Sequence, residues 1–548
     1  MAFEIDHDWQ GNLATPRARI GTAAKTRLLI VLCTIWIVLG LIGHQPWKPN
    51  ESTSISVIKT MLSGNHLLDP TAVGETGIVN PPLYYLSAAF FAKILSPILS
   101  IHDGARVVSG FWMALTLLGM GMIGRELWGE GLGRQNTFIL LSSVGLIGTA
   151  HMLTPEVATL TGSTMAFYAL ALAKRRPFRA SALLGTGIGI SFLSTGILTA
   201  SISVITSLVL PLFFKAWRSR SYAIVLGLAS LIASPWLLLW PAIIWHTSPD
   251  SLSAWWQAQT QLNLPHHLYF LRTLSWFAWP ALPIASWGLW RFRSNLFTKP
   301  KFQLIITYFV VAFTLIGFQA KSADIAALTL LIPLVAMAGG SAETLKRGAA
   351  GALNWFGLIL FGLIGLLIWL GWIAISTGYP SKLASRTHIL LGLDVLHTSP
   401  LALMIAIFIT LIWAITINAK RSNRAAVTDW AVGVTMAWSL LMALWLPMID
   451  SAKSYQSVML SLEKAIPSKM ACINSHGVGA PQQALLDYYT NLRLMPLETS
   501  PALSCDLLLV QNDKRRHIEV PGNDWSLIWE GKRPADRRES FSLYQKKD

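Results

Sequence analysis

Long apolar runs separated by short basic clusters dominate this sequence, and they limit the chain to the folds that a lipid bilayer allows. A helix needs about 20 apolar residues to cross about 30 Å of hydrocarbon, and it must satisfy all its backbone hydrogen bonds internally. Of the 548 residues, 53% are hydrophobic and 13% are charged. That balance is too apolar for a soluble protein of several domains, so we expect a polytopic α-helical membrane protein.

The apolar runs predict about 13 membrane crossings. The first run is not expected to be a cleaved signal peptide, because no small-residue cleavage site follows it. The predicted spans are Leu28–Gly43, Ala105–Trp128, Thr137–Ala150, Val157–Ala173, Ala180–Leu198, Ile202–Phe214, Ala223–Trp245, Leu274–Leu289, Leu304–Phe318, Ile325–Ala338, Leu353–Ile375, Leu401–Ile417 and Trp430–Pro447.

Basic clusters between the runs predict the orientation. Examples are "AKRRPFRA" at 173–180, "KAWRSR" at 215–220 and "AKRSNR" at 419–424. Because such clusters favour the cytoplasmic side, the N-terminus is predicted inside and the chain after Pro447 outside. The segment Leu83–Leu99 is then expected to be a juxtamembrane or re-entrant helix, since one more span would place the later clusters outside. The net charge of +16 reflects this anchoring and does not indicate nucleic-acid binding.

The composition divides the chain into three regions. A cytoplasmic segment is expected at 1–27, and a transmembrane domain at 28–448 with a first outer loop at 44–104. Residues 449–548 predict a small extracytoplasmic α/β domain. Its predicted helices are "SYQSVMLSLEKAI" and "PQQALLDYYTNL", and its predicted strands are "ACIN", "DLLLV", "WSLIWEG" and "SFSLYQ".

Two of the three cysteines lie in this C-terminal region. Cys472 and Cys505 each occur at a predicted strand, whereas Cys33 lies in the first apolar run. In an oxidising compartment a bridge between Cys472 and Cys505 adds about 3–4 kcal/mol of stability. Two buried free thiols are the alternative interpretation.

Polar residues collect in four patches at predicted outer turns. They are Asn50 with Glu51, Asn80 with the following "PPLYY", the turn His151–Glu156, and the turn Gln319–Asp324. Ionisable groups at the face of an apolar bundle indicate a functional site. For Glu156 alone the alternative is simpler, because an acid at a helix N-terminus stabilises the helix dipole by about 0.3–1 kcal/mol.

The order of these motifs resembles a known superfamily. The Asn50–Glu51 pair follows the first span, and "TMLSGNHLLDPTAVGE", "VNPPLYYL", "ARVVSGFWMALTLLGMGMIGRELWG" and "LTPEVATLTG" come after it. The sequence is similar to the polyprenyl-phosphate-sugar-dependent membrane glycosyltransferases, which include the aminoarabinose transferase of lipid A and the protein O-mannosyltransferases. The resemblance implies a GT-C-type helical bundle with its active site at the outer membrane face. It also implies transfer of a sugar from a polyprenyl-phosphate donor to lipid A, a glycan or a protein.

The resemblance carries roles onto particular residues. The first-loop acidic pair of the superfamily falls on Asn50 and Glu51, its second outer-loop acid on Glu156, and its phosphate-facing lysine on Asn80. Asn50 cannot take a proton and Asn80 carries no charge, so the site departs from the superfamily at both positions. We expect Glu51 to be the acceptor-side base, with Glu156 as a second acid that orients acceptor or donor.

The remaining substrate contacts are expected from Tyr84, Arg106 and Lys321. Arg106 and Lys321 supply positive charge for phosphate at the same face, although snorkelling to the interface is an equal alternative. The adjacent His266 and His267 have side chains of a type that binds metals, but without a fixed acidic partner we favour an interfacial pair of histidines with no metal.

No nucleotide cofactor is expected, and a divalent metal stays open. The expected partners are a polyprenyl-phosphate-linked sugar, a lipid or glycan acceptor and the membrane itself, with the chain in the plasma (inner) membrane. A relative that binds lipid-linked glycan without transfer is the main alternative. A transporter is less favoured, because few ionisable residues lie within the predicted spans.

Overall fold

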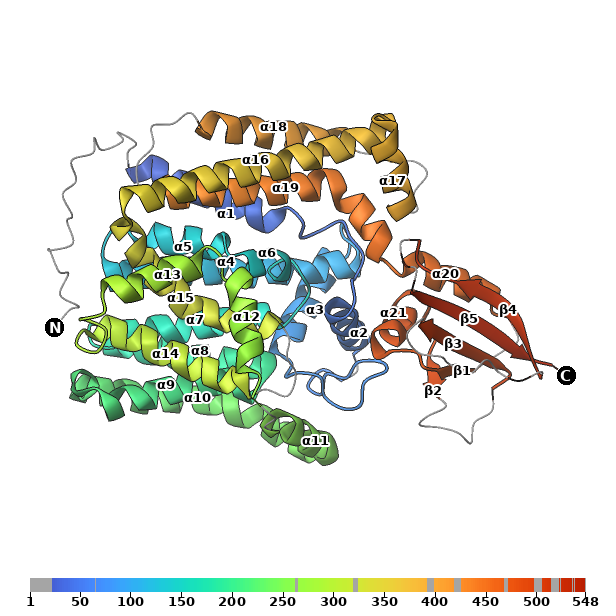
Figure 1. The fold of residues 1–548 in the computed structure, drawn as a ribbon. Coiled ribbons are helices and arrows are strands. Elements are labelled where there is room, and N and C mark those ends of the chain that lie inside the picture. The colour runs from blue at the N-terminus through green and yellow to red at the C-terminus, as the bar shows by residue number, and fades with distance from the viewer. Residues whose placement is uncertain are drawn as a thin grey trace.

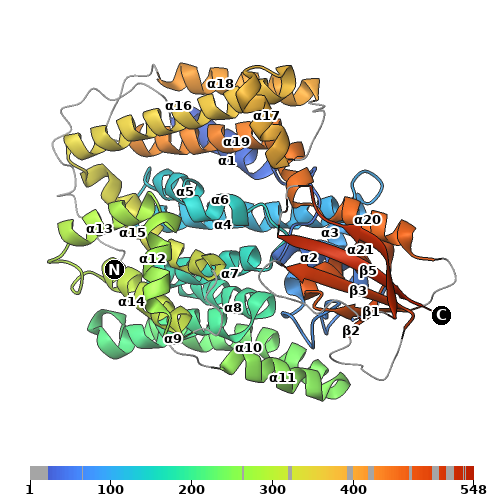
Figure 2. The same cartoon turned by 45° about the vertical axis from the view of Figure 1, so that its right-hand side comes forward.

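The computed structural model describes residues 22–64, 66–261, 265–318, 324–391, 399–417, 425–467, 472–496, 505–513, 522, 524–534, 536 and 538–547. Its long helices run side by side across the molecule, and a β-sheet lies at one end of them (Figures 1 and 2). The chain is therefore mostly helical with a small C-terminal sheet, as the sequence predicts.

The helical part runs from the N-terminal side of the described chain to the start of the sheet domain. In chain order the helices are α1 (Thr22–Val38), α2 (Asn50–Leu62), α3 (Leu83–Leu95), α4 (Ile101–Trp128), α5 (Gly133–Leu141), α6 (Val144–Thr149), α7 (Glu156–Leu172), α8 (Pro177–Thr195), α9 (Ile197–Phe213), α10 (Arg220–Thr247), α11 (Pro249–Thr260), α12 (His267–Phe277), α13 (Ala281–Arg291), α14 (Pro300–Gly317), α15 (Leu328–Ser341), α16 (Arg347–Thr377), α17 (Ser381–Leu391), α18 (Pro400–Ile417) and α19 (Ala425–Lys453), with short 3-10 turns η2 (Lys215–Trp217), η3 (Asp324–Ala327) and η4 (Ala342–Thr344).

Helices occur in all the predicted spans, and the multi-pass membrane character is confirmed. Within the described residues, six helical stretches are long and apolar enough to cross a bilayer, and the number of 13 crossings stays a prediction. They are Ile101–Trp128, Arg220–Thr247, Pro300–Gly317, Asp324–Thr344, Arg347–Thr377 and Ala426–Ala465.

Two predicted spans divide into shorter helices. The apolar run Thr137–Ala150 becomes α5 and α6, with Ser142 and Ser143 at the break. Both serine hydroxyls donate to carbonyls four residues earlier, a contact that bends helices. The second run, Leu274–Leu289, divides at Pro280, which has no N–H to continue the helix.

Helix α3 is short. Its 13 residues give about 20 Å of helix, less than the about 30 Å of hydrocarbon, and it packs against α2 and α4. This length fits the expectation that the segment does not cross the membrane. Helix α19 in contrast continues past Pro447 to Lys453, because proline is tolerated in membrane helices.

The core of the bundle lies around α15, all of whose residues are buried. Small residues allow its neighbours to approach closely. At Gly162 in α7, an added Cβ would lie 2.7 Å from the carbonyl oxygen of Gly187 in α8. Glycine at such crossings lets helix backbones meet in a membrane, where apolar burial alone gives little drive for association.

The C-terminal part is a five-stranded mixed sheet with strand order β2-β1-β3-β5-β4. Its elements are α20 (Gln456–Ala465), β1 (Ile473–His476), α21 (Ala480–Thr490), β2 (Leu494–Pro496), β3 (Leu507–Asp513), β4 (Trp525–Gly531) and β5 (Glu539–Lys546). Strand β1 is parallel to β2 and β3, and β5 is antiparallel to β3 and β4. All of them except the three-residue β2 coincide with a predicted helix or strand.

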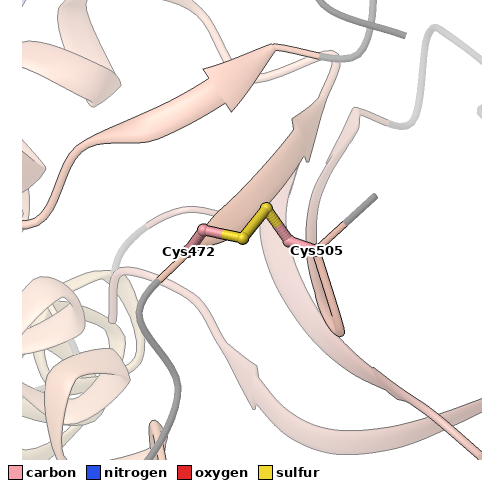
Figure 3. Close-up of a disulfide and its surroundings, with 2 residues drawn as sticks. All are labelled: Cys472 and Cys505. Atoms are coloured by element: carbon pink, nitrogen blue, oxygen red, sulfur yellow. A yellow bond between two sulfur atoms is a disulfide. The ribbon is translucent and has the colours of Figure 1, made fainter. Parts of the chain in front are cut away.

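A disulfide joins Cys472 and Cys505, with 5.6 Å between their Cα atoms (Figure 3). Cys472 directly precedes β1 and Cys505 lies just before β3. Because β1 and β3 are parallel neighbours, their starts lie at one edge of the sheet, which brings the two sulfurs together. The predicted disulfide is thus present in the structure.

Candidate active site at the junction of the bundle and the sheet domain

Helix α2 places Glu51 inside the protein. The helix begins after Pro49, and the Glu51 side chain in its first turn is 1% exposed. Its Oε1 accepts hydrogen bonds from Nε of Arg106 at 2.8 Å and from the backbone N–H of Leu153 at 2.9 Å. Its Oε2 accepts from the backbone N–H of Trp47 at 2.9 Å. The carboxylate therefore joins α2, α4 and the turn before α7.

Arg106 belongs to the same hydrogen-bond network. Ser100 caps α4 by accepting the N–H of Asp103, and this sets Asp103 and Arg106 one turn apart at the helix start. Arg106 Nη1 donates to Asp103 Oδ1 at 2.9 Å and to the His44 carbonyl at 3.2 Å. Its Nη2 is buried and has no hydrogen-bond partner within the described chain. Arg106 thus forms ion pairs with Glu51 and Asp103, and only its Nη2 group is without a hydrogen-bond partner among the described residues.

The charges of this network are set by burial and by Arg106. Burial alone would raise the pKa of the Glu51 carboxyl. The charge of Arg106, the nearby His44 and the hydrogen bonds from the backbone N–H groups of Trp47 and Leu153 together hold that pKa below its usual value. Burial, followed by the nearby Arg106 charge, lowers the pKa of His44. At neutral pH the carboxylate is charged and the imidazole is neutral.

A second set of polar side chains comes from the start of α3 and the residues before it. Asn80 Nδ2 donates to the Tyr85 hydroxyl at 3.3 Å, and the Tyr84 hydroxyl contacts that of Ser109 at 2.8 Å. Burial raises the pKa of Tyr85, and the charge of Glu156 adds to the rise.

Glu156 begins α7 and is half-buried. Thr154 donates a hydrogen bond to its carboxylate. Leu153, which binds Glu51, belongs to the same turn. Two of the acids expected from the sequence therefore lie on either side of one turn, and Tyr84 and Tyr85 of α3 border it.

A cavity of about 250 Å³ opens next to this network. Its walls are Trp47, Lys48, Pro49, Asn50, Met152, Lys453 and Arg533. Asn50 lines the cavity, whereas its neighbour Glu51 does not. Successive residues of a helix point about 100° apart, so Asn50 faces the cavity while Glu51 faces the protein interior.

The other expected residues lie elsewhere. Lys321 is outside the described residues. At the following turn, Asp324 accepts hydrogen bonds from the Tyr269 hydroxyl at 2.6 Å and from Thr273 at 3.2 Å. His267 packs its ring against Phe313 and Phe318. In the parts of the chain that the structure describes, no three His, Cys, Asp or Glu side chains gather as metal ligands.

Several residues of the junction were not expected from the sequence. Lys59 pairs with Asp487 at 3.2 Å, and the Tyr489 hydroxyl donates to Gln45 at 3.0 Å, so the sheet domain is fastened to the first outer loop. Helix α21 packs on α2, and both figures of the whole chain place it between the sheet and the bundle (Figures 1 and 2). The sequence gives a local signal only for Asp103 and Arg106, whose spacing of three suits an ion pair on a helix.

No family model matches this chain. Curated relatives nevertheless share one name. The undecaprenyl phosphate-alpha-4-amino-4-deoxy-L-arabinose arabinosyl transferase of Pseudomonas paraeruginosa is 23% identical over 434 residues, which cover 76% of this chain and 74% of that protein. The transferase of the same name from Pseudomonas savastanoi pv. phaseolicola is 22% identical over 447 residues, covering 76% of each protein.

A solved structure shares the fold over nearly the whole chain. ArnT from Cupriavidus metallidurans bound to undecaprenyl phosphate superposes with a TM-score of 0.67 at 12% identity, covering 96% of this chain and 98% of that one. The apo state of the same protein gives a TM-score of 0.68. The chain thus shares the fold of this membrane protein. Its particular likeness is to ArnT, in sequence and in structure, and the resemblance predicted from the motifs is confirmed.

Proposed function

We propose that this chain is a membrane glycosyltransferase that moves a sugar from a polyprenyl-phosphate donor to an acceptor at the outer membrane face. The main support is the continuous likeness to ArnT, which extends over 96% of the chain and includes the C-terminal sheet domain. The relatives named arabinosyl transferases match 76% of the chain, which adds support from sequence.

We further propose that the protein lies in the inner membrane, with residues 1–27 in the cytoplasm and residues 449–548 outside. The basic clusters between apolar runs favour this orientation. The disulfide between Cys472 and Cys505 supports an oxidising compartment for the sheet domain. The acceptor then meets the donor at the junction of bundle and sheet domain.

The reaction forms a bond between an acceptor oxygen and the anomeric carbon of the sugar. The bond from that carbon to the lipid phosphate breaks, and the phosphate leaves with the electron pair. A hydroxyl acceptor must also lose a proton, whereas an ionised phosphate acceptor brings none. The site therefore needs a carboxylate that takes the proton of a hydroxyl acceptor, and hydrogen-bond donors near the phosphate.

Glu156 fits the acceptor side better than Glu51 does. Glu156 is half-buried, and its carboxylate accepts a hydrogen bond from the Thr154 hydroxyl. Glu51 is fully buried, bound to Arg106 and two backbone N–H groups, and its low pKa makes it a weak base. We assign Glu51 as a positioning residue that holds the turn carrying Glu156, and Asn50 as an orienting amide in the cavity wall. Asn80, Tyr84 and Arg106 stay candidates for contacts with donor or phosphate, Arg106 through Nη2, which has no hydrogen-bond partner in the described ranges.

Lipid-linked glycan analysis of a deletion strain tests the function. Loss of the chain should raise the pool of polyprenyl-phosphate-linked sugar and remove one sugar from an outer-face glycolipid or glycan. The wild-type chain and the surface variant Glu130→Gln should restore the sugar, and Glu156→Gln should not. Unchanged donor and acceptor pools in the deletion strain would support the binding-only alternative instead.

A further inference from the structure

The cavity beside Asn50 is built by parts of the chain that are far apart in sequence. Trp47, Lys48 and Asn50 come from the first outer loop and the start of α2, and Met152 comes from the turn before α7. Lys453 is the last residue of α19, and Arg533 follows β4 in the sheet domain. The sheet domain thus completes the wall of a cavity that starts in the membrane part.

The lining of this cavity is cationic. It contains Lys48, Lys453 and Arg533 and no carboxylate. The Lys453 ammonium lies 4.3 Å from the centre of the Trp47 ring, and in the described part of the chain it pairs with no Asp or Glu. Trp47 therefore orients this cation through a cation–π contact without neutralising it.

The other two cations share one acidic partner, Glu539. Lys48 Nζ lies 3.1 Å from Glu539, and Arg533 Nη2 lies 3.5 Å from the same carboxylate. Asp536 is the second partner of Arg533. A third carboxylate, Asp450, accepts a hydrogen bond at 2.9 Å from Nε1 of Trp47, the ring that Lys453 also contacts. The three carboxylates are not part of the lining, so the groups that face the cavity are the cations. Nε of Arg533 adds a buried donor that has no partner within the described chain.

The size of the cavity suits a headgroup. Its volume of about 250 Å³ compares with about 30 Å³ for each water molecule in the liquid, so it has room for a phosphate and part of a sugar ring. Lysine and arginine bind phosphate oxygens through charge-assisted hydrogen bonds, which are about twice as strong as neutral ones. The Asn50 amide offers both a donor and an acceptor to a sugar hydroxyl.

We propose that the cavity formed by Lys48, Asn50, Lys453 and Arg533 binds the phosphate ester of a lipid substrate, so that the sheet domain is part of the substrate site. The phosphate belongs either to the polyprenyl donor or to a phosphorylated acceptor glycolipid. Naming the ligand as a substrate rests on the proposed function, but phosphate binding itself does not.

Equilibrium binding to the full-length protein in detergent tests the proposal. The probes are radiolabelled undecaprenyl phosphate, a phosphorylated glucosamine-disaccharide lipid and the same glycolipid without phosphate. Replacing Lys453 by Gln removes the cation that has no salt-bridge partner among the described residues, and we expect the affinity for a phosphate-bearing probe to fall at least about 10-fold. Lys453→Arg should keep most of the affinity.

Matched controls separate this site from general charge effects. Lys464→Gln removes an exposed lysine of α20, and Lys532→Gln removes the exposed neighbour of Arg533; neither should change binding. Arg533→Gln should weaken the same probe as Lys453→Gln. Because Arg533 also holds Asp536 and Glu539, a misfolded Arg533 variant leaves the decision to the Lys453 pair of variants.

Each outcome has one meaning. A loss confined to undecaprenyl phosphate assigns the cavity to the donor, and a loss confined to the phosphoglycolipid assigns it to the acceptor. Equal binding of both phosphate-bearing probes by wild type and Lys453→Gln overturns the proposal, and so does a loss in Lys453→Gln that is as large for the glycolipid without phosphate as for the phosphate-bearing probes. The assay requires no sugar transfer, so intact binding in a protein that transfers nothing would refute the proposed function and leave this site in place.

Discussion

The buried pair of Glu51 and Arg106 leads to a sharp prediction about the variant Glu51→Gln. Arg106 is 0% exposed and Glu51 is 1% exposed, and the Nε–Oε1 distance is 2.8 Å. The glutamine keeps one oxygen for Arg106 or Leu153, but its amide N–H₂ group then faces the N–H of Trp47. Two donors would point at each other where one accepted before, and Arg106 would keep only Asp103 as an acidic partner.

The magnitude follows from the burial of the pair. Removing one member of a buried ion pair costs about 3–5 kcal/mol, because the other charge remains buried and uncompensated. We therefore expect Glu51→Gln to lower the free energy of unfolding by about 3–5 kcal/mol. If Glu51 were an exposed base at the cavity mouth, the same variant would lose turnover with an intact fold.

Denaturant titration in mixed micelles, followed by tryptophan fluorescence, measures this change. The control is Glu130→Gln, which removes an acid from an exposed pair with Arg125 and should leave stability unchanged. The double variant Glu51→Gln with Arg106→Met should be less destabilised than the sum of the single variants, because each change removes the same interaction. Wild-type stability of Glu51→Gln, or additive effects in the double variant, would refute the positioning role.

Three more predictions follow from the same contacts. Folding lowers the pKa of Glu51, so its charged form stabilises the protein above the unfolded pKa of about 4.3, and this stabilisation is lost as the pH falls through the folded pKa. The free energy of unfolding should therefore fall less steeply with decreasing acidic pH in Glu51→Gln than in wild type. An unchanged slope would contradict the pKa shift. Reducing the bridge between Cys472 and Cys505 should cost the sheet domain about 3–4 kcal/mol and speed its proteolysis, and equal proteolysis rates would argue against that role. In intact cells a cysteine at His66 should react with an impermeant maleimide and one at Arg179 should not; the reverse pattern would invert the proposed orientation.

The helical part could be predicted from the sequence because hydrophobic length is a local property. Membrane helices satisfy their backbone internally, so an apolar run of sufficient length predicts the element without knowledge of its neighbours. The divisions at Ser142–Ser143 and at Pro280 depend on local bonding that a hydropathy count does not include. Strand β2 was missed because its three residues form a strand only by pairing with β1.

The site could be predicted only in part. Motif order led to Asn50, Glu51 and Glu156, and the structure brings these residues to one end of the bundle. Whether Asn50 or Glu51 lines the cavity depends on the rotation of α2 about its own axis. The packing of α2 against α21 and α3 determines this rotation. Lys453 and Arg533 lie hundreds of residues from Asn50 in the chain, so the cavity they share arises from tertiary packing that no local pattern records.

Sugar transfer by the purified protein is the most direct test of the central claim. Full-length protein in nanodiscs would receive undecaprenyl-phosphate-linked aminoarabinose and, in separate reactions, a phosphorylated glycolipid, a neutral glycolipid and a peptide acceptor. We predict that mass spectrometry finds one acceptor with an added sugar together with released undecaprenyl phosphate, and that Glu156→Gln lowers the rate at least about 100-fold. If the wild-type protein binds the donor yet leaves every acceptor unmodified, or if Glu156→Gln transfers sugar at the wild-type rate, the proposed transferase site is contradicted.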